Sequence, residues 1–253
     1  AKNRHGKIGD SSMNWNWQII IDSIPKLLQG SIITIELVVL SGLLGFMLAV
    51  PLALARLSKK PWVQALPFAY IFFFRGTPLL VQIFLIYYGL SQFKWVTESV
   101  LWKSGVLASP FWCAIIAFTL NTAAYIAEII RGAIKSIPKG ENEAADAIGM
   151  SYSQKLRRII FPRAFGIMLP AYGNEVIFML KGSALASTIT LMDITGVATT
   201  IMSKTYTVFE LFFASGIIYL LLSWLLIGMF RLAEKRINRH LSYQPVSNGG
   251  VTA

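Results

Sequence analysis

Apolar residues dominate five separate stretches of the chain, at residues 32–55, 66–90, 111–134, 165–191 and 211–230. Each stretch is close to the ~20 residues that an α-helix needs to cross the hydrocarbon core of a bilayer. The length and apolar character of these stretches predict five transmembrane helices in an all-α integral membrane protein.

The fourth stretch is the weakest, because Pro170, Asn174, Glu175 and Lys181 interrupt its apolar run. Polar groups and a proline are tolerated at membrane depth where they face protein or water. The segment is therefore expected either to cross the membrane inside a helical bundle or to form a re-entrant or interfacial helix.

Basic residues fall mainly between the apolar stretches, and they are divided unequally between alternate sides. One side has Arg56, Lys59, Lys60, Arg131, Lys135, Lys139, Lys155, Arg157, Arg158, Arg163, Arg231, Lys235, Arg236 and Arg239, whereas the other has Lys26, Lys94, Lys103 and Lys204. Because cytoplasmic loops carry the excess of Lys and Arg, the larger set is predicted to be cytoplasmic. The N-terminus is then outside and the C-terminus inside.

Composition supports the same class, since 55% of the residues are hydrophobic and 14% are charged. A net charge of +11 could indicate a nucleic-acid partner, but the loop positions of the basic residues explain it through membrane orientation. We therefore expect the protein to be surrounded by membrane lipid and to bind no nucleic acid. The single Cys113 lies in an apolar stretch, which excludes an intrachain disulfide and indicates a buried, unreactive thiol.

The two ends of the chain differ from its apolar middle. Residues 1–12 are polar and lack an apolar signal core, and Met13 with the amphipathic run 15–28 follows them. We expect 1–12 to be a cloning remnant or a processed leader, 13–240 to form one transmembrane domain, and 241–253 to be a polar tail.

The loop between the third and fourth stretches predicts two short helices around a glycine. Residues 141–148 are helix formers with acidic residues at the start, where the helix dipole favours them, and Gly149 suits the left-handed residue after a helix. Ser151 and Gln154 have the spacing of a capping box, and Pro162 is expected to end or kink the second helix. A rigid polar hairpin of this kind suits docking into a groove on a soluble partner.

This hairpin resembles the cytoplasmic motif of ABC-importer permease subunits, which has Glu-Ala-Ala, three residues, Gly, nine residues, and then Ile-x-Leu-Pro. The chain has Glu143, Ala144, Ala145, Gly149, Ile159, Phe161 and Pro162 at those positions, and Phe161 in place of Leu is the one departure. The resemblance covers residues 34–240. Segments 74–82, 120–125 and 169–175 narrow it to the polar amino-acid uptake branch, in which the chain looks most like the histidine, lysine, arginine, ornithine and opine permeases.

The resemblance implies a multi-pass protein of the bacterial inner membrane that translocates polar, above all basic, amino acids. The implied partners are a pair of ATP-binding subunits that hold ATP and Mg, a second permease subunit that is identical or related, and a periplasmic amino-acid-binding protein. The residues expected to couple the chain to its ATPase are Glu143, Ala144, Ala145, Gly149, Ser151, Ile159 and Pro162.

The chain lacks the Gly-x-x-x-x-Gly-Lys-Ser/Thr loop that cradles nucleotide phosphates, so we expect no ATPase activity on this chain. Energy then comes from another chain or from an ion gradient. A gradient-driven secondary amino-acid transporter is the alternative, with Glu128, Glu175 and Lys181 as a relay, but it leaves the hairpin unexplained. His5 and His240 lie outside the apolar stretches, and neither a metal site nor a catalytic triad is expected.

Arg75 lies nine residues into the second stretch, which is about 14 Å along a helix and near the middle of a ~30 Å core. Pro78 is expected to break this helix and free backbone groups to line a cavity. A guanidinium beside a new helix N-terminus suits the carboxylate of an amino acid. The alternative is that Arg75 pairs with Glu175 or Glu128 solely to hold the bundle together.

Further polar residues share helix faces within the apolar stretches. Asn121, Tyr125 and Glu128 have the spacing i, i+4 and i+7, while Asn174 and Lys181 share a face from which Glu175 points away. Such stripes are expected either to line a pathway or to join helices by hydrogen bonds. The expected substrate pathway consists of Glu36, Arg75, Gly76, Thr77, Pro78, Gln82, Asn121, Tyr125, Glu128, Asn174, Glu175 and Lys181, and its carboxylates favour a cationic substrate.

Overall fold

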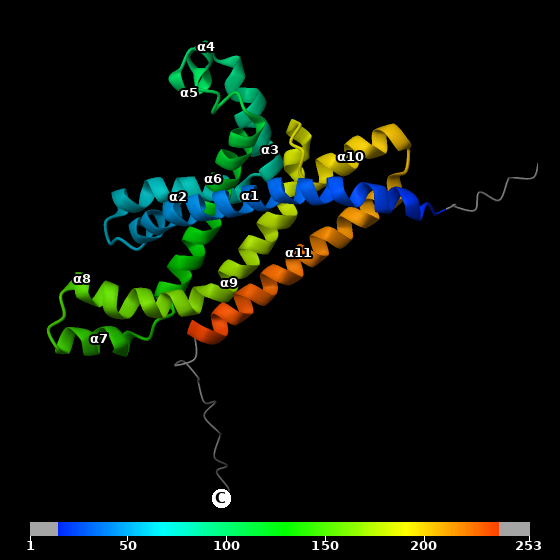
Figure 1. Ribbon diagram of the computed structural model, residues 1–253. Coiled ribbons are helices and arrows are strands. Elements are labelled where there is room, and N and C mark those ends of the chain that lie inside the picture. Colours follow the sequence, from blue (N-terminus) through cyan, green and yellow to red (C-terminus); the bar gives the residue numbers. More distant parts are fainter. Residues whose placement is uncertain (1–14, 238–253) are drawn as a thin grey trace, which may run out of the picture.

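A computed structural model describes residues 15–237, and within this range every regular element is a helix (Figure 1). The expected leader at 1–12, the tail at 241–253 and both histidines lie outside the described residues. The all-helical class predicted from the apolar stretches is confirmed for the part of the chain that the structure covers.

The first helix, α1 (Trp17–Arg56), is longer than the predicted span at 32–55, because it joins the amphipathic N-terminal run to that span. The Asn16 side chain caps it by accepting from two backbone N–H groups of the first turn. The helix packs along α6 (Pro110–Lys135), which matches the predicted third span. Small residues permit the close approach, since a Cβ at Gly45 would overlap the side chain of Thr122.

The predicted second span is broken. It forms α2 (Pro61–Gly76) and α3 (Leu79–Phe84). The chain bends by 106° between α2 and the helical segment Leu79–Gln92, which begins with α3. The π-helix η1 (Leu85–Gly89) and the 3₁₀-helix η2 (Leu90–Gln92) continue α3. The break lies at residues 77–78, as the expectation for Pro78 required.

Two short helices, α4 (Lys94–Thr97) and α5 (Val100–Lys103), project from the end of the bundle at which α6 begins (Figure 1). At the other end of α6 the chain enters α7 (Lys139–Ala147), α8 (Tyr152–Lys155) and the π-helix η3 (Leu156–Ile160). The predicted connecting hairpin thus lies at the opposite end of α6 from α4 and α5.

The predicted fourth span corresponds to α9 (Phe161–Gly182) and the 3₁₀-helix η4 (Ser183–Ile189). It is followed by α10 (Ile194–Thr205), a helix that the apolar pattern did not predict, at a bend of 46°. Asp193 caps α10 by accepting from the Gly196 N–H at 2.9 Å, and Tyr219 of α11 (Val208–Ile237) donates to the same carboxylate at 3.1 Å.

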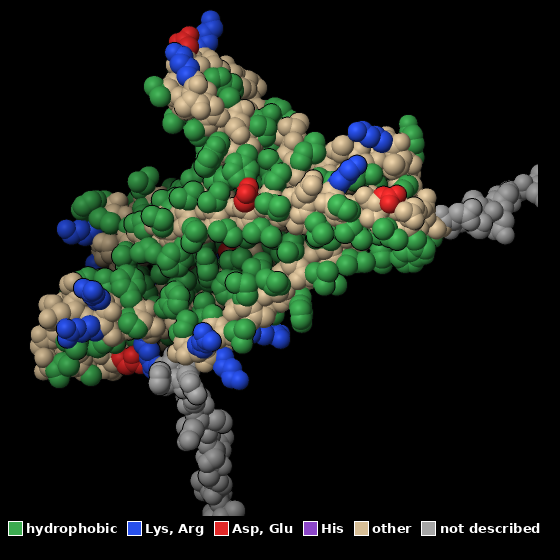
Figure 2. Space-filling model, viewed as in Figure 1, with side chains coloured by type: hydrophobic (Ala, Val, Ile, Leu, Met, Phe, Trp, Pro, Cys, Tyr) green, Lys and Arg blue, Asp and Glu red, His purple; other side chains and the backbone are tan. Residues whose placement is uncertain are grey.

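Among the described residues, three helices are long and apolar enough to cross a bilayer, namely α1, α6 and α11, and the number rises to five if each bent pair forms one span. Apolar side chains cover much of the visible surface, while Lys and Arg gather near the hairpin, at the end of α11 and at the tip formed by α4 and α5 (Figure 2). A helical membrane protein follows from these features. The count of five crossings and their orientation stay predictions.

Candidate functional sites

The hairpin of α7, α8 and η3 has the local structure that its sequence predicted. Gly149 ends the first helix with a φ of 74°, in the left-handed region that favours glycine. Ser151 Oγ accepts from the Gln154 N–H at 3.3 Å, and the Gln154 side chain accepts from the Ser151 N–H at 3.0 Å, which completes the capping box.

Pro162 does not end the second helix of the hairpin. The chain runs from α8 through η3 directly into α9, and Pro162 stands in the first turn of α9. A proline is tolerated there because the preceding π-helical residues change the hydrogen-bond register of the continuous helix. The helix after the hairpin is therefore continuous with the helix that enters the bundle.

Two ion pairs that no local sequence pattern predicted hold the hairpin closed. Arg163 Nη2 lies 2.8 Å from Glu141 Oε1, and Lys155 Nζ lies 2.8 Å from Asp146 Oδ1. Each pair joins α7 to the helix that follows the glycine turn. The hairpin is thus fixed at its base and near its tip.

The motif residues divide between a buried side and an exposed side of the hairpin. Ala145 is buried, with 1% of its surface exposed, so its small size serves packing within this chain. Glu143, Ala144, Gly149, Ser151 and Pro162 are exposed, and Ile159 is half-buried. Two large side chains at the tip, Ile148 and Tyr152, are each 71% exposed. The tip therefore presents apolar and polar groups that nothing in residues 15–237 covers.

Two side-chain amides hydrogen-bond to the backbone carbonyls at the break between α2 and α3. Gln82 Nε2 donates to the carbonyl oxygens of Phe74 and Thr77, at 2.9 and 3.1 Å, and to Thr77 Oγ1 at 2.8 Å. Asn121 of α6 donates to Phe74 O at 3.2 Å and to Gln82 Oε1 at 3.0 Å. Backbone groups freed by the break are thus paired, as they must be away from water.

Glu175 lies in a cavity of about 360 Å³ between α3, α6 and α9. Asn121, Thr122 and Tyr125 line the same cavity, together with the apolar side chains of Leu79, Phe118, Phe178 and Met179. Thr122 Oγ1 donates to Glu175 Oε1 at 3.3 Å. The cavity is mostly apolar with a few convergent polar groups and one carboxylate, which is the usual character of a small-molecule site. We call it the Glu175 cavity.

A second cavity of about 360 Å³ contains Arg75, Gly76 and Glu128, and it shares Tyr125 with the Glu175 cavity. The Arg75 guanidinium lies over the Tyr125 ring, 5.1 Å from its centroid. Such a cation–π contact leaves the polar edge of the guanidinium available. We call it the Arg75 cavity.

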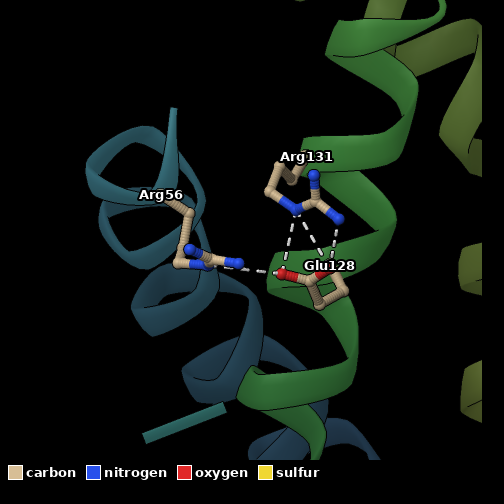
Figure 3. Close-up of polar contacts among 3 residues, drawn as sticks. All are labelled: Arg56, Glu128 and Arg131. Atoms are coloured by element: carbon tan, nitrogen blue, oxygen red, sulfur yellow. Dashed lines mark hydrogen bonds and ion pairs between the residues drawn. The ribbon is translucent and has the colours of Figure 1, made fainter. Parts of the chain in front are cut away.

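Glu128 is held by two arginines that the sequence analysis did not assign to it (Figure 3). Arg131 donates to both carboxylate oxygens, with the shortest contact at 2.6 Å, and Arg56 Nε lies 3.7 Å from Oε1. The i, i+3 spacing of Glu128 and Arg131 is the signal that would have indicated the first pair. Among the described residues Arg75 forms no ion pair within 4.0 Å of Glu128 or Glu175, and both interpretations of Arg75, as a substrate ligand or as a structural partner of these carboxylates, stay predictions.

Six expected pathway residues line neither cavity. Glu36, Asn174 and Lys181 are exposed and line neither cavity. Thr77, Pro78 and Gln82 form the break rather than the cavity walls. Between residues 15 and 237, no three His, Cys, Asp or Glu side chains are grouped as a metal site requires.

A helical bundle with two bent helix pairs, cavities that hold charged and polar side chains, and a projecting hairpin has the architecture of a membrane permease. Residues 41–239 match the family described as "Binding-protein-dependent transport system inner membrane component". The chain belongs to this family, which confirms the family expected from the hairpin motif.

Individual relatives agree with this assignment. The chain is 49% identical over 225 residues to the nopaline transport system permease protein of Agrobacterium fabrum, a match that covers 88% of this chain and 92% of that protein. It is 42% identical over 212 residues to the histidine/lysine/arginine/ornithine transport system permease protein of Escherichia coli, covering 84% and 89% of the two chains. In a solved amino acid ABC transporter, a chain with 35% sequence identity superposes with a TM-score of 0.78, and the match covers 88% of this chain and all of that one.

Proposed function

We propose that the chain is the permease subunit of an ABC importer that carries polar, mainly basic, amino acids across the bacterial inner membrane. The observation that carries the substrate class is the Glu175 cavity, where a single carboxylate stands among apolar walls with a threonine hydroxyl beside it. An uncompensated carboxylate at membrane depth is costly, and a cationic side chain of the substrate would offset that cost. The named substrates of the relatives, among them arginine and lysine, agree with this chemistry.

The Arg75 cavity supplies the complementary charge. Arg56 and Arg75 line this cavity with one carboxylate, Glu128, and Arg131 is paired with that carboxylate, so the local charge is positive. The two cavities meet at Tyr125, which lines both. A zwitterionic amino acid at this junction places its carboxylate toward Arg75 and its positive side chain toward Glu175.

The hairpin is the proposed contact with a separate ATP-binding subunit, which holds ATP and Mg. Its exposed tip at Ile148 and Tyr152 offers an apolar anchor, and the ion pairs at Glu141 and Asp146 keep it rigid. Because the second hairpin helix continues into α9, a push on the tip is transmitted to the helix that carries Glu175. A second permease subunit and a periplasmic amino-acid-binding protein complete the proposed assembly.

The test is uptake of radiolabelled amino acids into proteoliposomes that hold the chain with its ATP-binding partner and binding protein. Glu175→Gln is expected to lower uptake of cationic amino acids by about tenfold, the equivalent of one charge-assisted hydrogen bond, while neutral ones fall less. Arg75→Lys keeps the charge but loses the planar fork, so uptake of all substrates should fall. Glu36→Gln, at an exposed carboxylate outside both cavities, is the matched control.

Two outcomes would contradict the proposal. Uptake that follows an imposed ion gradient without ATP or a partner would make the chain a secondary transporter. Parental uptake by both cavity variants, in assemblies that still hydrolyse ATP, would place the substrate site elsewhere.

A further inference from the structure

A third cavity, of about 620 Å³, lies at the hairpin end of the bundle between α1, α6, α9 and the end of α11. Its lining includes Val50, Phe161, Phe165, Met168 and Ile237. It shares no lining residue with the Glu175 cavity or the Arg75 cavity. Of the described residues that line it, Arg157 alone is charged.

Arg157 and the adjacent Arg158 both lack an ion-pair partner within residues 15–237, but the residue that lines this cavity is Arg157. Lys155 and Arg163, which flank it on the same continuous helix, are each paired with a carboxylate of α7. Within residues 15–237 the guanidinium of Arg157 is in no ion pair or hydrogen bond, and the residue is exposed. An unpaired guanidinium beside an apolar cavity is complementary to a ligand with an anionic head and an apolar body.

The dimensions favour an acyl chain over a soluble anion. On α9 the wall runs from Phe161 to Met168, seven residues or about 10 Å along an α-helix. Half of a ~30 Å hydrocarbon core is about 15 Å, so a cavity of this length holds the upper part of one lipid chain within one leaflet. Basic residues gather around this end of the bundle (Figure 2), as expected near anionic headgroups.

We propose that this cavity binds an anionic phospholipid, with one acyl chain between α1 and α9 and the phosphate on Arg157. The site is independent of the proposed substrate pathway. Since Arg157 and Phe161 belong to the helix that joins the hairpin to α9, the bound lipid contacts the connection between the hairpin and the bundle. Occupancy of the site by lipid should therefore stabilise that connection.

The test is native mass spectrometry of the full chain purified from membranes and incubated with phosphatidylglycerol or with phosphatidylcholine of the same acyl chains. The parent should retain one phosphatidylglycerol per chain in preference to phosphatidylcholine. Arg157→Gln should reduce phosphatidylglycerol occupancy about fivefold, the effect expected for one basic residue at an anionic surface. The control Lys59→Gln removes an exposed positive charge that does not line the cavity and should leave occupancy unchanged.

A second variant separates the acyl chain from the headgroup. Val50→Phe narrows the cavity without changing charge, and it should reduce retention of both lipids. Glycerol phosphate at millimolar concentration should not displace the lipid, because it lacks the chain that the cavity holds. Equal retention of the two lipids by the parent, or parental occupancy in Arg157→Gln, overturns the proposal. So does a gain of bound lipid after deletion of residues 241–253, which would indicate that the tail occupies the cavity.

Discussion

Replacing Glu128 by Gln removes the charge that holds Arg56 and Arg131 together. The Arg56, Glu128 and Arg131 side chains are 18%, 17% and 23% exposed, so this cluster lies between a surface ion pair and a buried one. Exposed pairs are worth ~0–1 kcal/mol, whereas removing one partner of a buried pair costs ~3–5 kcal/mol. We therefore expect Glu128→Gln to lower the free energy of unfolding by about 2 kcal/mol.

The loss has two physical sources in this site. Gln cannot accept the charge-assisted fork from Arg131, and its NH₂ group would face a guanidinium. The Nε of Arg56 is already buried without a hydrogen bond, so the ion pair at 3.7 Å is the compensation it has within this chain. Arg56 and Arg131 then have no opposing carboxylate, although they lie near each other and near Arg75.

Thermal unfolding of the detergent-purified chain measures this effect. A loss of 2 kcal/mol corresponds to a fall in Tm of about 4–8 °C for a chain of this size. The control Glu36→Gln should melt like the parent, because Glu36 is exposed and has no ion-pair partner in residues 15–237.

The double variant Glu128→Gln with Arg131→Gln also removes one of the two unpaired positive charges, so it should recover about half of the lost stability. The reasoning is refuted if Glu128→Gln melts within about 1 °C of the control, which would mean that solvent already screens the cluster.

Three further predictions concern other parts of the molecule. Gly149→Val forces a β-branched residue to a φ of 74°, so the ratio of transport to ATP hydrolysis should fall while membrane insertion, followed by fractionation, is unchanged. Gln82→Leu leaves the carbonyls of the helix break unpaired, so the free energy of unfolding should fall by about 2–3 kcal/mol, measured as a lower Tm in detergent. In a Cys113→Ala background, a cysteine at Lys103 should react with an impermeant maleimide in intact cells, and one at Lys139 only after the inner face is opened; the reverse pattern would overturn the orientation.

Local signals made the hairpin predictable. The glycine turn and the capping box depend on residues within a few positions of each other, and both formed as expected around Gly149 and Ser151. The break at Pro78 was predictable for the same reason, since a missing N–H acts on its own helix.

Features that depend on distant parts of the chain were not predictable in this way. Arg56 reaches Glu128 only because α1 packs along α6, and no pattern within either segment indicates that contact. The size of the 106° bend and the helix α10 were not predicted, because hydropathy gives the length of an apolar run but not its direction. The placement of Glu175 in a cavity and of Lys181 outside it likewise depends on which helices surround α9.

The amides at the helix break bear on which parts of the permease can move. Gln82 belongs to α3, whereas the carbonyl of Phe74 belongs to α2 and Asn121 to α6, so three helices are tied at one point. Rotating α3 against α2 would leave polar groups unpaired away from water, at ~1–3 kcal/mol for each. The kink is therefore a rigid joint rather than a hinge, and α2, α3 and α6 are expected to move as one body. On the proposed pathway past Glu175, opening is then expected to come from displacement of α9, the helix to which the hairpin is directly connected.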